Sequence, residues 1–78
     1  MLHVMDDNAF RKFVEDATEQ TMPYTSWDYW NDTLFLNGCT AREVAKLQTV
    51  FEYAGIGVIV TPYNASFAND ADYAIDFV

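Results

Sequence analysis

The first periodic pattern along the chain predicts a helix that begins at Asp6 or Asp7 and ends by about Gln20. An aspartate at either starting position can accept hydrogen bonds from the free N–H groups of the first turn. Pro23 sets the far limit, because the residue before a proline disfavours helical geometry. The apolar side chains that recur at i, i+3, i+4 and i+7, and so share one face, are Phe10, Phe13, Val14 and Ala17.

A second periodic pattern predicts another helix, which begins after Thr40 and ends before Gly55. Thr40 and Glu43 form a capping box, in which each side chain accepts a hydrogen bond from the backbone N–H of the other residue. Glycine after the last periodic position is a common C-terminal stop. The apolar face of this helix is expected to contain Val44, Leu47, Phe51 and Ala54.

Residues 26–36 (SWDYWNDTLFL) contain two short runs that are rich in aromatic and aliphatic side chains. Asn31 and Asp32 separate the runs, and both residue types tolerate positive φ angles, so we expect a hairpin with a two-residue turn. In a competing interpretation, Ser26 caps a single helical turn that runs through Trp30 and precedes one strand. The sequence leaves both interpretations open.

A hairpin at this position divides the side chains between two faces, because successive residues of a strand point to opposite sides. One face suits a core and carries Trp27, Tyr29, Leu34 and Leu36. The other face mixes acid with aromatic rings and carries Asp28, Trp30, Thr33 and Phe35. Either the first helix covers Trp30 and Phe35, or the two rings form an exposed patch with an acidic rim, as binding hot spots do.

Two more strands follow the second helix. The run GVIVT (57–61) predicts a buried strand that is broken at Pro62, and DYAIDFV (72–78) alternates, with Tyr73, Ile75 and Phe77 on one face. Residues 33–36, the second helix and residues 57–60 can form a right-handed β-α-β unit, with the last strand pairing against its neighbour. The sequence therefore predicts one α+β domain over residues 1–78, a two-layer sandwich of two helices on a three- to four-stranded sheet.

The charge of the chain limits which partners it can bind. Twelve acids face four bases in 78 residues, and the net charge is −8. Such a surface repels nucleic acid and anionic membranes and attracts basic partners, so we expect no direct binding to either. The single cysteine, Cys39, cannot form an internal disulfide, and no targeting segment is visible near the start. Both observations favour a cytoplasmic location.

Catalytic and metal-binding patterns are sparse. His3 is the only histidine, and a catalytic role for Cys39 would need a base from that distant residue. The segment Asp70-Ala71-Asp72 begins like a calcium loop but lacks the loop's glycine and closing glutamate. We expect no metal, no cofactor and no enzymatic activity, while a small enzyme that uses Cys39 or a carboxylate pair remains an alternative.

Five acids have no base nearby in sequence: Asp28, Asp32, Asp70, Asp72 and Asp76. The four bases all fall on the two predicted helices, where acids lie within reach of most of them. The excess negative charge is therefore expected on the turns and strands. Together with Trp30 and Phe35, these five acids are the candidate partner-binding residues. If they gather on one side, they could imitate the charge of a single nucleic-acid strand.

Small size, strong acidity and aromatic residues interleaved with aspartate make the chain resemble phage-encoded anti-CRISPR and antirestriction inhibitors. The resemblance is compositional and includes no motif. It implies an inhibitor encoded by a phage or mobile element that occupies a basic nucleic-acid-binding groove of a bacterial defence complex, in the host cytoplasm. The alternative is a general protein-interaction module, or a homodimeric subunit joined through the face that carries Trp30 and Phe35.

Overall fold

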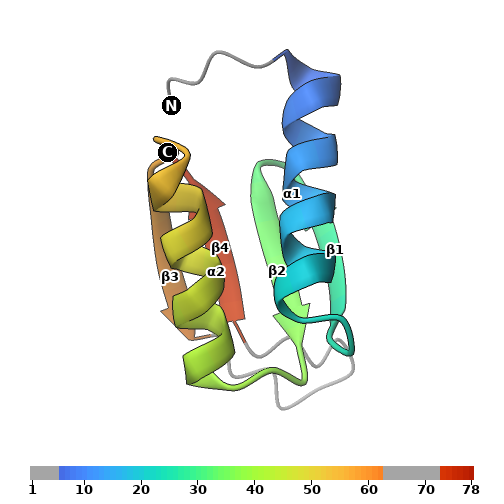
Figure 1. Cartoon of the computed structure of the whole chain (residues 1–78), viewed down its shortest axis with the longest axis vertical. Coiled ribbons are helices and arrows are strands. Elements are labelled where there is room, and N and C mark those ends of the chain that lie inside the picture. The colour runs from blue at the N-terminus through green and yellow to red at the C-terminus, as the bar shows by residue number, and fades with distance from the viewer. Residues whose placement is uncertain (1–5, 63–72) are drawn as a thin grey trace.

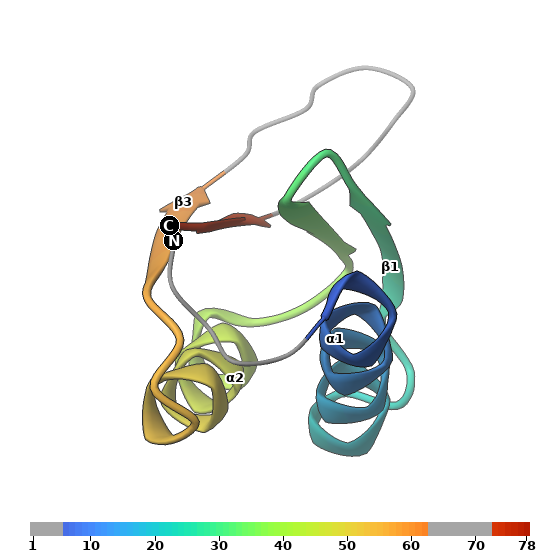
Figure 2. The ribbon, with the colours of Figure 1, turned by 90° about the horizontal axis from the view of Figure 1, so that it is seen from above.

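A computed structural model describes residues 6–62 and 73–78 and shows two helices beside a four-stranded antiparallel sheet. The elements in chain order are α1 (Asp7–Thr21), β1 (Ser26–Trp30), β2 (Thr33–Asn37), α2 (Ala41–Tyr53), β3 (Val58–Pro62) and β4 (Tyr73–Phe77). The sheet order is β1-β2-β4-β3 (Figure 1). Both helices lie on the same face of the sheet (Figure 2), which confirms the predicted α+β sandwich.

Both helices begin at the expected caps. The Asp6 side chain accepts a hydrogen bond of 2.8 Å from the backbone N–H of Ala9. At α2, the backbone N–H of Glu43 donates to the Thr40 hydroxyl, and the backbone N–H of Thr40 donates to the Glu43 carboxylate. The end of α2 is also as expected, because Gly55 has a positive φ of 78° there.

The hairpin between β1 and β2 forms with the predicted register, and the competing helical turn is wrong. Asn31 and Asp32 have φ angles of 55° and 61°, the left-handed pair that a tight two-residue turn requires. The strands pair from Trp30 opposite Thr33 to Ser26 opposite Asn37. Local turn chemistry thus decides which side chains of β1 and β2 face the helices.

The expected β-α-β unit is present, but it is split by another strand. β4 is antiparallel to both β2 and β3 and lies between them, so β2 and β3 are parallel to each other without touching. In Figure 1 the chain descends along β2, rises along α2 in front of the sheet and descends along β3 at the left, a right-handed crossover.

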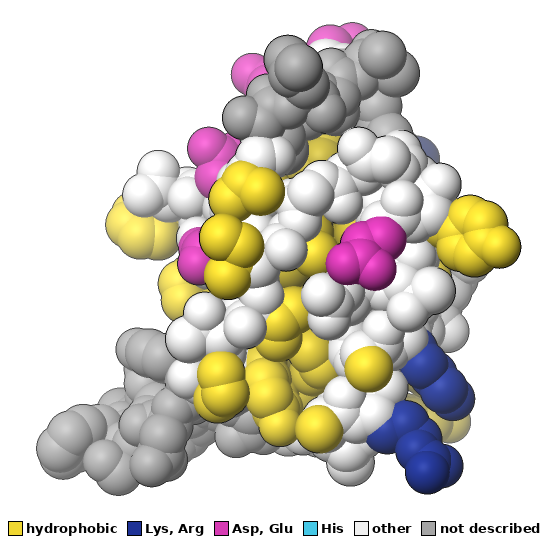
Figure 3. Space-filling view, turned by 90° about the vertical axis from the view of Figure 1, so that its left-hand side faces the viewer, with side chains coloured by type: hydrophobic (Ala, Val, Ile, Leu, Met, Phe, Trp, Pro, Cys, Tyr) yellow, Lys and Arg dark blue, Asp and Glu magenta, His cyan; other side chains and the backbone are white. Residues whose placement is uncertain are grey.

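β3 is an edge strand, so the prediction of a buried strand over residues 57–61 is wrong. Val58 and Val60 are half-buried against the core, whereas Ile59 is 54% exposed. The strand runs to Pro62 and ends there. Figure 3 views the molecule from the side on which β3 lies and shows a band of hydrophobic side chains there. The central position that the sequence pattern predicted for β3 is occupied by β4.

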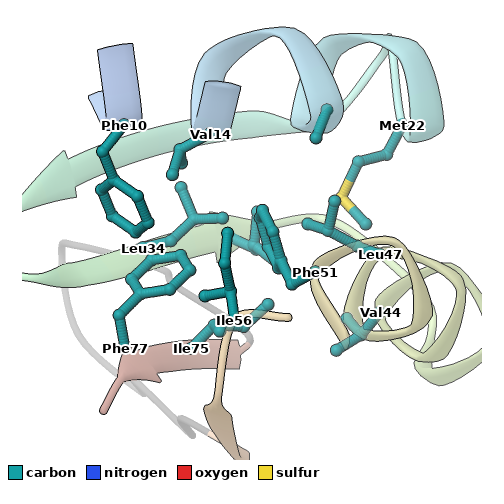
Figure 4. Packing of buried hydrophobic residues seen from close by; sticks show 12 residues of the cluster. Phe10, Val14, Met22, Leu34, Val44, Leu47, Phe51, Ile56, Ile75 and Phe77 are labelled. Atoms are coloured by element: carbon teal, nitrogen blue, oxygen red, sulfur yellow. The ribbon is translucent and has the colours of Figure 1, made fainter. Parts of the chain in front are cut away.

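The core lies between the helix pair and the sheet and is built around aromatic rings (Figure 4). The Phe77 ring has its centroid 5.1 Å from that of Phe51 and 5.2 Å from that of Phe10, both in edge-on geometry. Phe51, Leu34 and Leu36 are fully buried. The predicted faces of the helices mostly hold, but Ala54 is exposed because α2 ends before it and its turn leaves the core.

Replacing Phe51 with leucine is expected to lower the free energy of unfolding by about 1–2 kcal/mol, since ring contacts are lost and a small void remains. Urea unfolding followed by circular dichroism measures the change. Val50 is the matched control, because it is on the same helix but 36% exposed. Val50→Ala should stay within about 0.5 kcal/mol of the parent. Equal losses for the two variants would contradict this view of the core.

Candidate functional site: the open face of the sheet

No helix of the described residues covers the second face of the sheet, which we call the open face. Its members alternate with the core residues of each strand. They are Ser26, Asp28 and Trp30 of β1, Thr33, Phe35 and Asn37 of β2, Ala74 and Asp76 of β4, and Ile59 and Thr61 of β3. No lysine or arginine is among them, because all four bases of the chain lie on α1 and α2.

The strand register gives the open face two neighbouring rows that cross all four strands. Trp30, Thr33, Asp76 and Ile59 form one row, and Asp28, Phe35, Ala74 and Thr61 form the other. Adjacent strands are about 4.8 Å apart, so the Asp76 backbone lies roughly 10 Å from that of Trp30 and about 5 Å from that of Ile59. One carboxylate is therefore set between two exposed apolar side chains.

Trp30 projects from the open face at the turn end of β1, and its side chain is 68% exposed. The expectation that the first helix covers Trp30 and Phe35 is wrong, because α1 packs on the opposite face (Figure 2), where the centre of the Phe10 ring lies 6.3 Å from that of Tyr29. Phe35, beside Ala74 on the central strands, is half-buried. Trp30 is therefore exposed on a face that no described helix covers, while Phe35 is half-buried on the same face.

Asp76 is held in a defined position on this face. It lies opposite Thr33, and the Thr33 hydroxyl donates a hydrogen bond of 2.7 Å to its carboxylate. The short bond suits a charged acceptor, and the Asp76 side chain is half-buried. Asp28 is exposed on β1, across from Phe35. These two acids and the two rings form the candidate site.

Asp32 lies apart from the candidate site. It occupies the hairpin turn and accepts a long hydrogen bond of 3.5 Å from the Tyr29 hydroxyl, and Tyr29 belongs to the helix side of the sheet. The Arg11 guanidinium lies 5.5 Å from the centre of the same ring. Of the other predicted site residues, Asp70 and Asp72 lie outside the described part of the chain.

A polar cavity of about 570 Å³ next to this turn was not predicted from the sequence. It lies between the start of α1 and the hairpin tip, and its lining includes Asp7, Asn8, Arg11, Tyr29 and Asp32. The start of α1 and the hairpin tip are both rich in Asp and Asn, which is visible in the sequence. That the two segments lie side by side cannot be seen from either one alone. Arg11 also pairs with Glu15 at 3.6 Å, so its charge is partly balanced within α1.

The negative charge is shared between the two layers of the molecule, which corrects the expectation that it belongs to turns and strands. α1, α2 and their caps contain seven acids beside the four bases. The helix layer therefore still has a net charge of −3. The distinction that remains is qualitative: the helices mix both signs, and the described strands carry only acids.

The described residues also include the candidate catalytic thiol and possible metal ligands. Cys39 is half-buried and packs against the core. Within residues 6–62 and 73–78, no three His, Cys, Asp or Glu side chains are grouped so as to hold a metal ion. None of the helices in that part of the chain has the length and apolar character needed to cross a membrane.

Comparison of the chain with protein-family models, with curated proteins and with solved structures found no match.

Tyr29 is expected to make the fold sensitive to alkali. Burial, and then the nearby Asp32 carboxylate, raise the pKa of the Tyr29 phenol above its ordinary value of 10.0. The unfolded chain thus loses this proton at a lower pH than the folded chain. The stabilisation is complete below pH 10.0 and is lost as the pH rises through the higher pKa of the folded state.

Urea unfolding at about pH 8 and about pH 10.5 measures this effect. Tyr29→Phe should lose less stability between the two pH values than the parent. Tyr24→Phe is the matched control, because the Tyr24 side chain is 99% exposed. A Tyr29→Phe variant with the same pH dependence as the parent would refute the assignment.

Proposed function

We propose that this protein is a small acidic inhibitor that places the open face of its sheet on a basic, nucleic-acid-binding surface of another protein. The observation that carries the proposal is the composition of this face, where Asp28 and Asp76 accompany Trp30 and Phe35 without any base. Acidic side chains around an aromatic anchor favour a partner of opposite charge and raise the rate of encounter.

The chemistry of the face favours arginine as the contacted group of the partner. A guanidinium can stack on an indole ring and can also bind a carboxylate through two parallel hydrogen bonds. Trp30 offers the exposed ring, and Asp76 offers a carboxylate that Thr33 already orients. Arginine-rich grooves are typical of nucleic-acid-binding proteins, and the compositional resemblance to anti-CRISPR and antirestriction inhibitors indicates a bacterial defence complex as the target.

Complete imitation of a nucleic-acid strand is not part of this proposal. The chain measures 36 × 22 × 18 Å, and one DNA strand presents about ten charges over roughly that length. The described open face has two acids, so it can replace only a few phosphates. We therefore propose that the rings supply much of the affinity and that the acids select a basic surface.

A homodimer joined through this same face is the second candidate, and charge argues against it. Such a dimer would bring Asp28 and Asp76 of one copy close to the same acids of the other copy. Both pairs would then lose water without gaining a counter-charge, which is costly at an interface. A basic partner turns the same acids into favourable contacts.

The test is a pull-down from bacterial lysate with the parent protein and open-face variants, followed by mass spectrometry. A retained nucleic-acid-binding protein should be released by added single-stranded oligonucleotide, and by salt raised from about 50 to about 300 mM. Binding of the purified partner should weaken about 30-fold in Trp30→Ala, the loss typical of an aromatic hot spot. Asp76→Asn should weaken it several-fold.

Two matched variants control for the loss of a ring and of a charge. Tyr24→Ala removes a fully exposed ring outside the sheet, and Glu19→Gln removes one charge from the exposed side of α1. Both should bind as the parent does. If these two variants lose as much affinity as Trp30→Ala and Asp76→Asn, or if the partner has no basic surface, the proposal is wrong.

A further inference from the structure

The outer edge of β3 offers backbone hydrogen-bonding groups that no described strand uses. β3 is the last strand of the sheet, and β4 is its single described neighbour. The backbone N–H of Val78 donates to the carbonyl of Gly57 at 3.0 Å, which identifies residue 57 as a position bonded to β4. Bonded positions alternate along an antiparallel ladder, so Ile59 and Thr61 also point to β4.

The residues of β3 that alternate with these positions therefore point their backbone groups away from β4. Val58 and Val60 each present an N–H and a carbonyl at the free edge, and Pro62 presents a carbonyl alone. This explains how a proline fits at the end of the strand, because its missing N–H would have faced away from β4. Each chain thus offers two donors at this edge.

Charge distinguishes this edge from the other edge of the sheet. Residues 53–69 contain no charged side chain, and β3 lies within them. β1, at the opposite edge, has Asp28 at its centre. Two copies paired symmetrically through the middle of β1 would place this acid opposite itself, which is unfavourable. For a chain of net charge −8, β3 is the edge where a second copy meets no acid on the pairing strand.

We propose that a second copy of this chain pairs with β3, antiparallel across a two-fold axis, so that two sheets become one of eight strands. With Val60 opposite its own mate, the pair exchanges two hydrogen bonds. Val58 then donates to the Pro62 carbonyl of the other copy, twice by symmetry. Two donors per copy limit the ladder to four hydrogen bonds.

Side chains around the edge add apolar contact to the backbone ladder. Ile59 of one copy lies across from Thr61 of the other on the open face, where Ile59 is 54% exposed. The hydrophobic band seen in Figure 3 continues along this side, and Val78 nearby is 49% exposed. The interface is smaller than a standard one, so we expect a dissociation constant on the order of 0.1 mM.

Dimerisation through β3 does not depend on the proposed function, and the effect of salt distinguishes the two. Two chains of like charge repel each other, so screening should strengthen dimerisation. Binding to a basic partner should weaken under the same change. Sedimentation equilibrium of the purified protein at about 50 and about 300 mM salt measures the first effect without any partner.

Amide hydrogen exchange by NMR, at about 20 µM and about 1 mM protein, tests the interface directly and needs no substitution. The amides of Val58 and Val60 should exchange about fourfold more slowly at the higher concentration, as mass action predicts for this affinity. The amides of Ile59 and Thr61 are the internal control, because β4 binds them in monomer and dimer. A monomer at both concentrations, or a dimer without slower exchange at Val58 and Val60, would overturn the proposal.

A pair of variants then assigns the effect to the backbone. Val60→Pro removes one outward donor, and Val60→Ala shortens the same side chain but keeps the N–H. Circular dichroism checks that both remain folded. Val60→Ala should dimerise and Val60→Pro should stay monomeric. A folded Val60→Pro that dimerises as strongly as Val60→Ala would contradict pairing through this edge.

Discussion

The turn at Asn31 and Asp32 is the constraint on which the rest of the structure depends. Because strand side chains alternate, a slip of one residue in the β1–β2 register would exchange the two faces of the hairpin. Leu34 and Leu36 would then meet water, and Phe35 would enter the core. The left-handed φ angles at the turn prevent this slip. They fix the core and, by the same alternation, the rings and acids of the open face.

Features that depend on residues close together in sequence could be predicted from the sequence. The strand order depends on packing between distant segments and could not. The caps at Asp6 and Thr40 and the hairpin register follow from side chains within a few residues. The insertion of β4 between β2 and β3 does not, since an apolar run such as residues 57–61 fits a central strand and an edge strand alike. Asp32 shows the same limit, because its place beside Tyr29 on the helix side required the turn geometry.

Charge is the basis on which we propose different partners for the two surfaces of this protein. A face with acids and no base gains from a cationic surface, whereas an uncharged edge is the place where a strongly acidic chain can meet its own copy. The proline at the end of β3 is consistent with this division. It removes one donor from the free edge and so limits how far a ladder can extend, as edge strands often do to restrain open-ended pairing.

The two surfaces are also linked by geometry. A two-fold axis between antiparallel strands runs perpendicular to the sheet, so pairing through β3 keeps both open faces on the same side. Eight strands at about 4.8 Å would then form one acidic and aromatic surface roughly 35–40 Å wide. Trp30 would lie near each end of that surface, with Asp76 of each copy nearer the axis. A dimer would therefore double the number of contacts available to a basic partner, and simultaneous engagement strengthens binding where the partner's basic surface is equally long.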